Sequence, residues 1–312
     1  MLMQPADYFK ALADETRLRL VNLLSHYELN VNEIVEILNM GQSRISRHLK
    51  ILTDHLLLTF RRDGLWSFYS VPDDGRGLKF IKAINYLFKN EEIYPADLMA
   101  AQQVIEQRSK ETIRFFDSIA EDWGELKSDI FGDFRLNEYI VDQIPFSRTA
   151  VDLGCGTGDL LAYLQKVSDR VIGVDKSPKM LEEARKRFLD EKSKIDLRIG
   201  EIEHLPLGDR EADLAIINMV LHHIPSPLES FKEISRILKP NGYFIIVDFL
   251  KHNNENLRQK YGDRWLGFYE SAIKKWLTAT GFYSNKVDYI NLDKGLRGIM
   301  IRSMKKRIQS NA

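Results

Sequence analysis

The chain has 312 residues, with 45 lysines and arginines against 45 aspartates and glutamates, and is long enough for two domains with an ample core. The balanced charge predicts no global attraction to nucleic acid, and the single cysteine excludes a disulfide framework and a thiolate zinc site within one chain. Residues 1–20 lack the apolar segment of a secretory signal and no apolar run is long enough to span a bilayer, so we expect a soluble, cytoplasmic protein without a membrane partner.

The first ninety residues (1–90) are predicted to fold as a helix-turn-helix. A first helix with apolar residues on one face is followed by a second over residues 32–38, capped by Asn30 or Asn32. A third helix is expected over residues 42–52, after a short turn that contains glycine. Two apolar helices joined by such a turn are typical of a helix-turn-helix.

Two alternating segments after these helices predict a β-hairpin. Leu56–Arg61 and Leu65–Val71 alternate like strands, and Arg62-Asp63-Gly64 between them is a turn signal. The hairpin would be the wing of a winged helix-turn-helix domain, which makes the N-terminal domain α+β.

The polar face of the third helix and the wing carry the candidate DNA-binding residues. Residues 42–62 contain five lysines and arginines but one acid, Asp54, and phosphate contact requires such a local excess. His48 either contacts phosphate or packs against the domain, and the sequence leaves both open. The candidates are Gln42, Ser43, Arg44, Ser46, Arg47, Lys50, Arg61 and Arg62.

The string Leu-Ala-Asp-Glu-Thr-Arg-Leu-Arg-Leu at 12–20, with Ser-Arg-His-Leu-Lys at 46–50 and the wing, resembles the ArsR family of bacterial regulators. The resemblance implies binding to duplex DNA and a homodimer paired through a helix over 78–88. Two recognition helices related by a two-fold axis imply a pseudo-palindromic operator. Residues 28–33 have asparagines where metal-sensing members have cysteines, so thiol-based metal sensing is not expected.

Residues 91–120 are predicted to be a helical linker. The segment 91–95 is the expected domain boundary. Residues 96–116 contain neither glycine nor proline and read as one long helix, a semi-rigid joint rather than a flexible tether.

Residues 151–161 contain the most informative motif of the chain. An apolar strand ends in Asp152 and is followed by Gly154, Gly156 and Gly158, and then by an apolar helix start. Glycine allows a sharp turn and close approach to a ligand, and the following helix is expected to direct unpaired N–H groups at the loop. A dinucleotide fingerprint would need glycine at position 159, which is Asp159.

Further strands are expected downstream. The second, over 171–175, ends in Asp175, which lies 21 positions after Gly154, close to the spacing that places a carboxylate on a ribose diol. Three more are expected over 195–199, 213–219 and 243–248, with helices between them.

The glycine loop resembles the D-x-G-x-G-x-G loop of class I S-adenosylmethionine (SAM)-dependent methyltransferases. Leu-His-His at 221–223 and Leu-Lys-Pro-x-Gly at 238–242 resemble the small-molecule branch that includes ubiquinone-biosynthesis methyltransferases. The resemblance covers residues 109–304. It implies an α/β, Rossmann-like domain with a mostly parallel seven-stranded sheet, and SAM or S-adenosylhomocysteine (SAH) as the cofactor. Residues 115–123 resemble the segment that covers the SAM pocket. The cofactor-binding candidates are Asp152, Gly154, Gly156, Gly158, Asp175, Lys176, Glu201, Ile202 and Asn218.

His222, His223 and Asp248 are the candidates for proton transfer. Methyl transfer from a sulfonium often needs only alignment and desolvation, so the sequence does not decide which residues are catalytic. Two adjacent histidines are too few ligands for a metal site, and none is expected. Within the aromatic segment 249–269, Trp265-Leu266-Gly267-Phe268 either lines a substrate pocket or packs as a plain loop.

Two functions compete for this domain order. It resembles SAH-responsive ArsR-type regulators, so we expect a DNA-binding transcription regulator whose methyltransferase-fold domain senses SAM or SAH. The alternative is an active SAM-dependent methyltransferase on a small-molecule acceptor, with the winged helix for autoregulation or dimerisation. The cofactor loop is intact in both cases. A substrate pocket with a placed base favours the enzyme, and a pocket closed around the cofactor favours the sensor.

Overall fold

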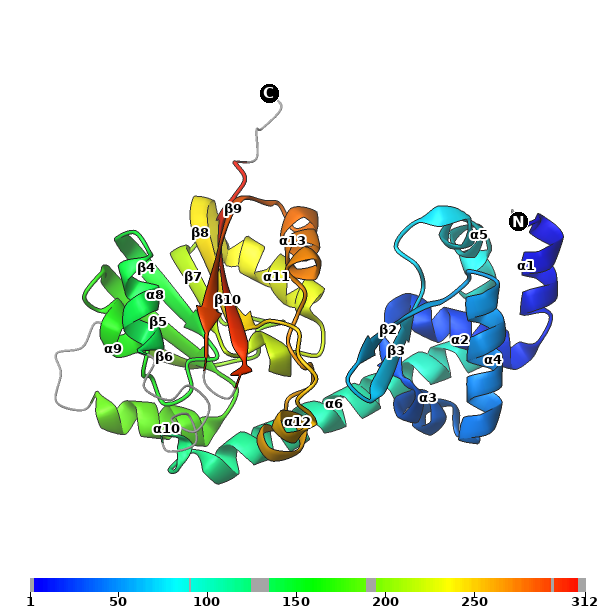
Figure 1. Cartoon of the computed structure of the whole chain (residues 1–312), viewed down its shortest axis with the longest axis horizontal. Coiled ribbons are helices and arrows are strands. Elements are labelled where there is room, and N and C mark those ends of the chain that lie inside the picture. The colour runs from blue at the N-terminus through cyan, green and yellow to red at the C-terminus, as the bar shows by residue number, and fades with distance from the viewer. Residues whose placement is uncertain (1–2, 90, 125–134, 189–194, 293–294, 308–312) are drawn as a thin grey trace. The chain divides into compact units, whose positions relative to one another are not determined.

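The chain folds into two compact units, Met1–Lys110 and Glu111–Ala312, in a computed structural model that describes residues 3–89, 91–124, 135–188, 195–292 and 295–307 (Figure 1). The division falls inside helix α6 (Ile93–Ile119), which therefore contributes residues to both units. Each unit has its own hydrophobic core.

Unit 1 is a small helical domain with a three-stranded sheet. The sheet has the order β1-β3-β2, with each neighbouring pair antiparallel. Its helices and strands are α1 (Pro5–Leu12), α2 (Glu15–His26), β1 (Leu29–Asn30), α3 (Val31–Leu38), α4 (Gln42–Asp54), β2 (Thr59–Asp63), β3 (Trp66–Ser70), α5 (Gly75–Ile84), the 3-10 helix η1 (Asn85–Lys89) and the first part of α6. The predicted helix-turn-helix is thus α3 and α4, and the predicted wing is β2 and β3.

The helix-turn-helix is held by local hydrogen bonds and by one apolar stripe. Asn30 caps α3: its side chain accepts from the Glu33 N–H at 3.1 Å, and the Glu33 carboxylate accepts from the Asn30 N–H at 2.9 Å. The helix ends at Asn39, whose φ of 51° turns the chain toward α4. On α4, Ile45 and Leu49 are fully buried in the core of unit 1, so the opposite face of the helix is left to solvent.

Some elements of unit 1 differ from the sequence expectations. Strand β2 begins at Thr59 and continues through Asp63, so the hairpin turn is the pair Gly64 and Leu65. The predicted helix over 78–88 is α5 followed by η1. Strand β1 was not predicted, because two residues are too few to show a periodicity.

The segment predicted as a linker is helical, but its first half packs into unit 1. Helix α6 begins at Ile93, with Pro95 in its first turn, where the missing N–H costs no helical hydrogen bond. Tyr94 and Ala101 are buried in the core of this unit. The buried Asp97 accepts two hydrogen bonds from the Arg19 guanidinium, at 2.8 and 2.6 Å, which fixes α6 to α2.

Unit 2 is a seven-stranded sheet covered by helices. The strand order is β6-β5-β4-β7-β8-β10-β9, in which the first five strands are parallel and β10 is antiparallel to both β8 and β9. The elements are α8 (Leu136–Asp142), β4 (Ser147–Leu153), α9 (Leu161–Leu164), β5 (Ser168–Asp175), α10 (Pro178–Arg187), β6 (Ile195–Ile199), β7 (Ala212–Asn218), the 3-10 helix η2 (Leu221–His223), α11 (Pro227–Ile237), β8 (Leu238–Phe249), α12 (Glu255–Tyr261), α13 (Glu270–Ala279), β9 (Phe282–Asn291) and β10 (Arg297–Lys305). This arrangement confirms the predicted mostly parallel seven-stranded sheet.

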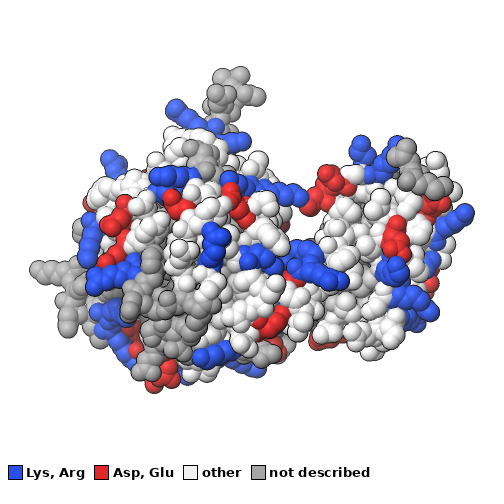
Figure 2. All heavy atoms as spheres, in the orientation of Figure 1, with Lys and Arg blue, Asp and Glu red and all other residues white. Residues whose placement is uncertain are grey.

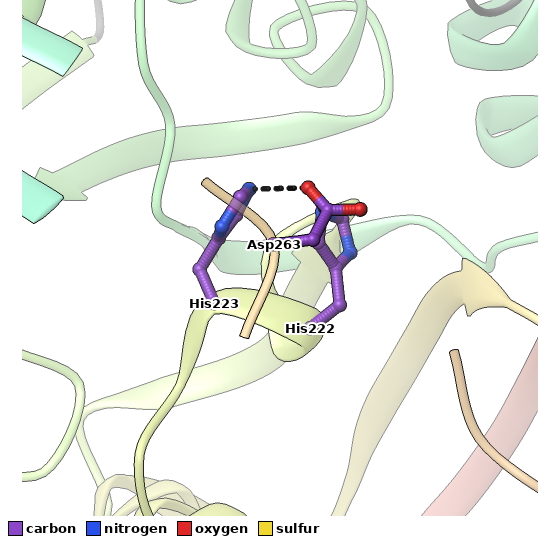
Figure 3. A group of neighbouring side chains, drawn as sticks. All are labelled: His222, His223 and Asp263. Carbon is purple, nitrogen blue, oxygen red and sulfur yellow. Dashed lines mark ion pairs between the residues drawn. The ribbon is translucent and has the colours of Figure 1, made fainter. Parts of the chain in front are cut away.

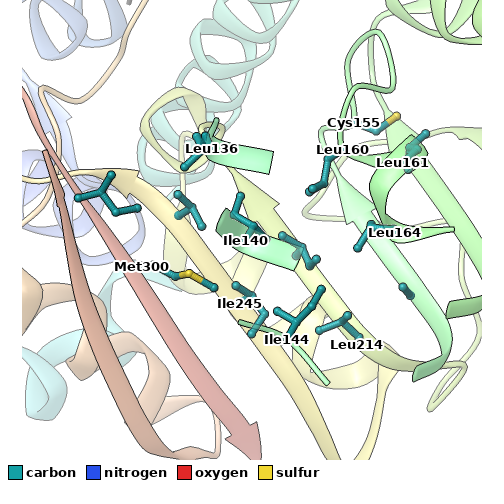
Figure 4. Close-up of a cluster of buried hydrophobic side chains, with 14 of the residues drawn as sticks. Leu136, Ile140, Ile144, Cys155, Leu160, Leu161, Leu164, Leu214, Ile245 and Met300 are labelled. Carbon is teal, nitrogen blue, oxygen red and sulfur yellow. The ribbon is translucent and has the colours of Figure 1, made fainter. Parts of the chain in front are cut away.

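The core of unit 2 lies between the sheet and its helices. Figure 1 shows α8 and α9 on one side of the sheet and α11 and α13 on the other. Because both faces are covered, the central strands are nearly continuous apolar runs. Side chains of α8 such as Ile140 pack with Leu164 of α9 and with Ile245 of β8 (Figure 4).

No described helix is long and apolar enough to cross a membrane. On the face drawn in Figure 2, basic and acidic side chains are interspersed, in line with the formal net charge of zero.

Candidate functional site

A cavity of about 560 Å³ lies at the carboxyl ends of strands β4, β5 and β7. Ligands of open parallel sheets bind at this edge, where the order of the strands reverses. Eight of the nine cofactor-binding candidates line the cavity; the exception is Gly158. The cavity extends past the glycine loop to η2 and α12.

The three glycines of the loop have different roles. All have positive φ, at 74°, 53° and 80° for Gly154, Gly156 and Gly158. A Cβ on Gly154 would lie 2.7 Å from the Val220 side chain, and one on Gly158 would lie 2.8 Å from Phe188. Gly154 and Gly156 line the cavity, and the space beside Gly156 is the more open, with the nearest atom to its added Cβ at 3.7 Å. Gly158 packs against Phe188 and does not line the cavity, so its place in the cofactor site stays a prediction.

The helix expected after the loop is short. Helix α9 begins at Leu161 and has four residues, Leu161–Leu164. Hydrogen bonds to Asp175 hold the loop. The Gly156 N–H donates to Asp175 Oδ2 at 2.8 Å, and the Ser177 N–H donates to Oδ1 at 2.8 Å. Burial raises the pKa of Asp175, and these two N–H donors oppose the shift.

The cavity offers polar groups suited to an adenosyl amino acid. Asn218 Oδ1 is buried at its edge and has no hydrogen-bond partner among the described residues, so a ligand N–H or ammonium group could satisfy it. Asp175 keeps lone pairs for a diol, and Gly156 leaves room for close approach. The residues present therefore fit SAM or SAH.

Cys155, the single cysteine, is buried in the same loop. Burial raises the pKa of its thiol well above the ordinary value, with the carboxylates of Asp175 and Asp152 adding to the shift. The thiol is thus held in its neutral, weakly nucleophilic form.

The two histidines of η2 have fixed ring orientations. His222 Nδ1 donates to Asp248 Oδ1 at 2.8 Å, and His223 Nδ1 donates to the Gly262 carbonyl at 3.3 Å. Both Nε2 atoms therefore face Asp263. The Oδ1 atom of Asp263 lies 3.7 Å from His222 Nε2 and 4.0 Å from His223 Nε2 (Figure 3). Asp248 is fully buried beneath His222 and does not line the cavity, so it positions the ring rather than contacting a ligand.

The ionisable side chains of His222, His223 and Asp263 alter one another's pKa values. Burial opposes a positive charge on His222, but Asp248 and Asp263 outweigh it and raise the pKa of His222 to about 9. Burial raises the pKa of Asp263 to about 6. Burial and the neighbouring His222 hold the pKa of His223 well below its usual value, which favours the neutral imidazole.

Backbone hydrogen bonds place Asp263 against the histidines. The N–H groups of Arg264 and Trp265 both donate to the His222 carbonyl, at 3.1 and 3.0 Å. The Trp265 indole is buried and donates to the Ile224 carbonyl at 2.7 Å. Trp265 does not line the cavity, so the Trp265–Phe268 stretch packs as a structural loop, the second of its two predicted roles.

Aromatic residues of the segment 115–123 lie at the cavity. Phe116, on α6, packs edge-on against the His223 ring with centroids 4.9 Å apart, and against Trp123 at 5.7 Å. Both aromatic residues line the cavity.

Sequence reasoning missed several residues of the cavity, among them Asp263 and Asn137. Asp263 lies forty positions after His223, and no motif connects them. Asn137, whose Oδ1 lies 3.4 Å from Asn218 Nδ2, comes from α8 ahead of the first strand. The cluster of polar residues in the aromatic segment 249–269 was the only available signal for Asp263.

The candidate DNA-binding face lies on α4 of unit 1. All six candidates on this helix are exposed, whereas His48 is buried, which places His48 in the domain core rather than at phosphate. Two of the six have partners: Lys50 Nζ lies 3.0 Å from Asp54, and Arg44 donates to Thr16 at 3.2 Å. Arg47 projects from the same exposed face.

The two wing arginines differ. Arg62 is exposed on β2. Arg61 is half-buried and lies 2.7 Å from Glu28 and 3.2 Å from Asp63, with its guanidinium over the Phe68 ring. Its charge is already compensated within the domain, so Arg62 is better suited to contact phosphate.

Comparison with known proteins identifies both parts of the chain. Residues 14–55 match the family model described as bacterial regulatory protein, arsR family, and residues 151–246 match the model described as methyltransferase domain. The chain thus carries an arsR-family helix-turn-helix and a methyltransferase domain. Such a methyltransferase domain implies SAM or SAH as the ligand of the cavity.

Similar proteins match the methyltransferase part. An uncharacterized methyltransferase, YodH, of Bacillus subtilis is 41% identical over 98 residues, 31% of this chain and 42% of that protein. A demethylmenaquinone methyltransferase of Lactobacillus johnsonii is 38% identical over 110 residues, 34% of this chain and 45% of that protein. The chain thus spans less than half the length of these relatives.

Solved structures with the same fold include one from Thermotoga maritima. It is a SAM-dependent methyltransferase, possible histamine N-methyltransferase. It superposes with a TM-score of 0.51 at 23% identity, covering 62% of this chain and all of that one. This likeness concerns the fold alone.

Proposed function

We propose that this chain is a DNA-binding transcription regulator whose C-terminal domain is a working SAM-dependent methyltransferase for a small-molecule acceptor. The observation that carries the enzymatic part is the extent of the cavity. It continues beyond the glycine loop to His222, His223 and Asp263, where a neutral imidazole and a carboxylate can hold an acceptor. A cavity closed around the cofactor alone would not include these groups.

The chain's own residues would hold the cofactor and align the acceptor. When bound, SAM supplies a methyl group on a sulfonium. Asp175 would accept hydrogen bonds from the ribose diol, and Asn218 would accept one from the amino acid part of the cofactor. Phe116 and Trp123 would exclude water from the reacting atoms. Lys176, Glu201 and Ile202 complete the proposed cofactor wall.

Methyl transfer can be tested without knowing the acceptor. The purified protein is incubated with SAM labelled on its methyl group and a small-molecule extract of bacterial cells, and the label in the extract is measured. We expect label to accumulate with the wild-type protein, and at least about tenfold less with Asp175→Ala, whose diol contact is removed. Equal labelling by the two proteins, or none by either, would contradict the enzymatic proposal.

The N-terminal unit would bind duplex DNA as a homodimer. Its exposed α4 face and Arg62 would contact a pseudo-palindromic operator whose half-sites lie about one helical turn apart, or a multiple of it. Support comes from the arsR-family match over residues 14–55.

A second proposed function is that the cofactor or its product regulates DNA binding. One observation favours it: α6 contributes Tyr94 and Ala101 to the core of unit 1 and Phe116 to the cavity of unit 2. A ligand that orders Phe116 acts on a helix shared with the DNA-binding unit. Such coupling typically amounts to about 1–3 kcal/mol and is reciprocal.

This coupling predicts that SAH weakens DNA binding by about 5- to 150-fold and that SAM, which carries an extra methyl group and a positive charge, has a smaller effect. DNA titrations without ligand, with saturating SAM and with saturating SAH measure it. Three superimposable curves would exclude the sensing role while leaving methyl transfer untouched.

A further inference from the structure

We propose that His222, His223 and Asp263 bind a divalent first-row transition-metal ion at the wall of the cavity. Each side chain offers one ligand atom, and the three atoms lie within 4.8 Å of one another (Figure 3). An ion with metal–ligand bonds of about 2.0–2.2 Å separates its ligand atoms by about 3–4 Å. The distances of 3.7 and 4.0 Å from Asp263 Oδ1 to the two Nε2 atoms match this range.

The two imidazole rings make the kind of hydrogen bonds that metal-binding histidines commonly make. A histidine that binds a metal through one nitrogen commonly donates its other N–H to a carboxylate or a backbone carbonyl. His222 donates to Asp248 and His223 donates to the Gly262 carbonyl, both through Nδ1. The two Nε2 atoms are thereby directed at the same carboxylate, Asp263.

The carboxylate of Asp263 supplies an independent observation. The residue is 3% exposed, and its Oδ2 has no hydrogen-bond partner among the residues that the structure describes. A buried carboxylate oxygen without a donor is costly. Asp248, which is fully buried, adds a second carboxylate behind His222. A bound dication would take the place of the proton on His222 Nε2, and binding through both oxygens of Asp263 would give Oδ2 a partner.

The site is built before any ion binds. The N–H groups of Arg264 and Trp265 tie the backbone after Asp263 to the His222 carbonyl at 3.1 and 3.0 Å. Arg258 donates to the carbonyls of Asp263 and Arg264. Asp263 is therefore held against His222 by its backbone, so the ion would find its ligands in place.

The ligand set indicates the class of ion. Two imidazoles and one carboxylate suit zinc, cobalt, nickel or iron, whereas magnesium and calcium prefer all-oxygen sites. Three protein ligands leave at least one coordination position open, and all three side chains line the cavity. That position could take an oxygen or nitrogen atom of the small molecule bound there. The inference goes beyond the proposed function, because an ion would bind whether or not methyl transfer follows.

Cobalt titration tests the site directly. Untagged full-length protein is freed of metal with a chelator and titrated with Co²⁺, and the visible absorption of the ion is recorded. The wild-type protein should bind one Co²⁺ per chain, with an absorption typical of nitrogen and oxygen ligands. His222→Gln, His223→Gln and Asp263→Asn should each weaken binding at least about 100-fold, because the loss of an outer-shell partner alone commonly costs 10- to 100-fold.

A control variant and two further measurements distinguish the loss of a metal ligand from misfolding. His204→Gln removes an exposed histidine of the same unit and should bind Co²⁺ like the wild type. SAH binding and thermal unfolding identify variants that fail to fold. No cobalt absorption in the wild-type protein would overturn the proposal, and so would unchanged binding in all three folded variants. Because the readout is independent of methyl transfer, its failure would leave the proposed function standing.

Discussion

Asp175→Ala is expected to weaken SAH binding by about 2–4 kcal/mol, which is about 30- to 700-fold in the dissociation constant. The loss of two charge-assisted hydrogen bonds to the ribose diol is the physical reason. The carboxylate also accepts the N–H groups of Gly156 and Ser177, so its removal loosens the glycine loop as well. Isothermal titration calorimetry with SAH measures the effect.

Two variants separate binding from folding in this experiment. Asp175→Asn keeps the size and the acceptor oxygen of the side chain but loses its charge, and should fall between wild type and alanine. Asp169→Ala removes an exposed acid at the other end of β5 and should bind SAH like the wild type. A folded Asp175→Ala protein with wild-type affinity would remove Asp175 from the proposed site.

The double variant Arg47→Ala/Arg62→Ala is expected to bind duplex DNA about 10- to 100-fold more weakly, because two exposed cations leave the proposed DNA-binding face. The slope of log affinity against log salt should flatten by about 0.9 for each phosphate contact removed. Fluorescence anisotropy with a labelled duplex at several salt concentrations measures both quantities.

Single arginine variants serve as controls for the DNA prediction. Arg185→Ala removes an exposed cation on α10 and should leave the salt slope unchanged. Arg61→Ala should have a smaller effect than Arg62→Ala, because Glu28 and Asp63 already compensate Arg61. A double variant with the wild-type slope would refute the assignment of this face to DNA.

Local patterns predicted the fold well where a pattern extends over many residues. The alternation of apolar runs and helices predicted five of the strands, among them β5, an apolar run that ends in Asp175. The seven-stranded sheet was implied by the resemblance to class I methyltransferases. The capping residue of α3 stayed ambiguous in the sequence. Asn30 and Asn32 have the same chemistry, and only the geometry with Glu33 distinguishes them.

The parts that escaped prediction depend on contacts between distant residues. Asp263 reaches the histidines because Arg264 and Trp265 bind the His222 carbonyl, and no periodicity encodes that contact. Gly158 fits the glycine motif by sequence, and only the structure shows that Phe188 packs against it. The first half of α6 looked like a linker because its buried residues are too few to mark a core-facing stripe.

The single buried cysteine can report on local opening of the glycine loop. Cys155 is the only thiol, so any reaction with a thiol reagent comes from the glycine loop. Because Cys155 is only 8% exposed and its thiol is kept protonated, labelling should be slow while the loop is folded and faster in molecules in which the loop has opened. A change in the rate at which Cys155 is labelled, for example when SAH fills the cavity, therefore reports on this loop without any engineered probe.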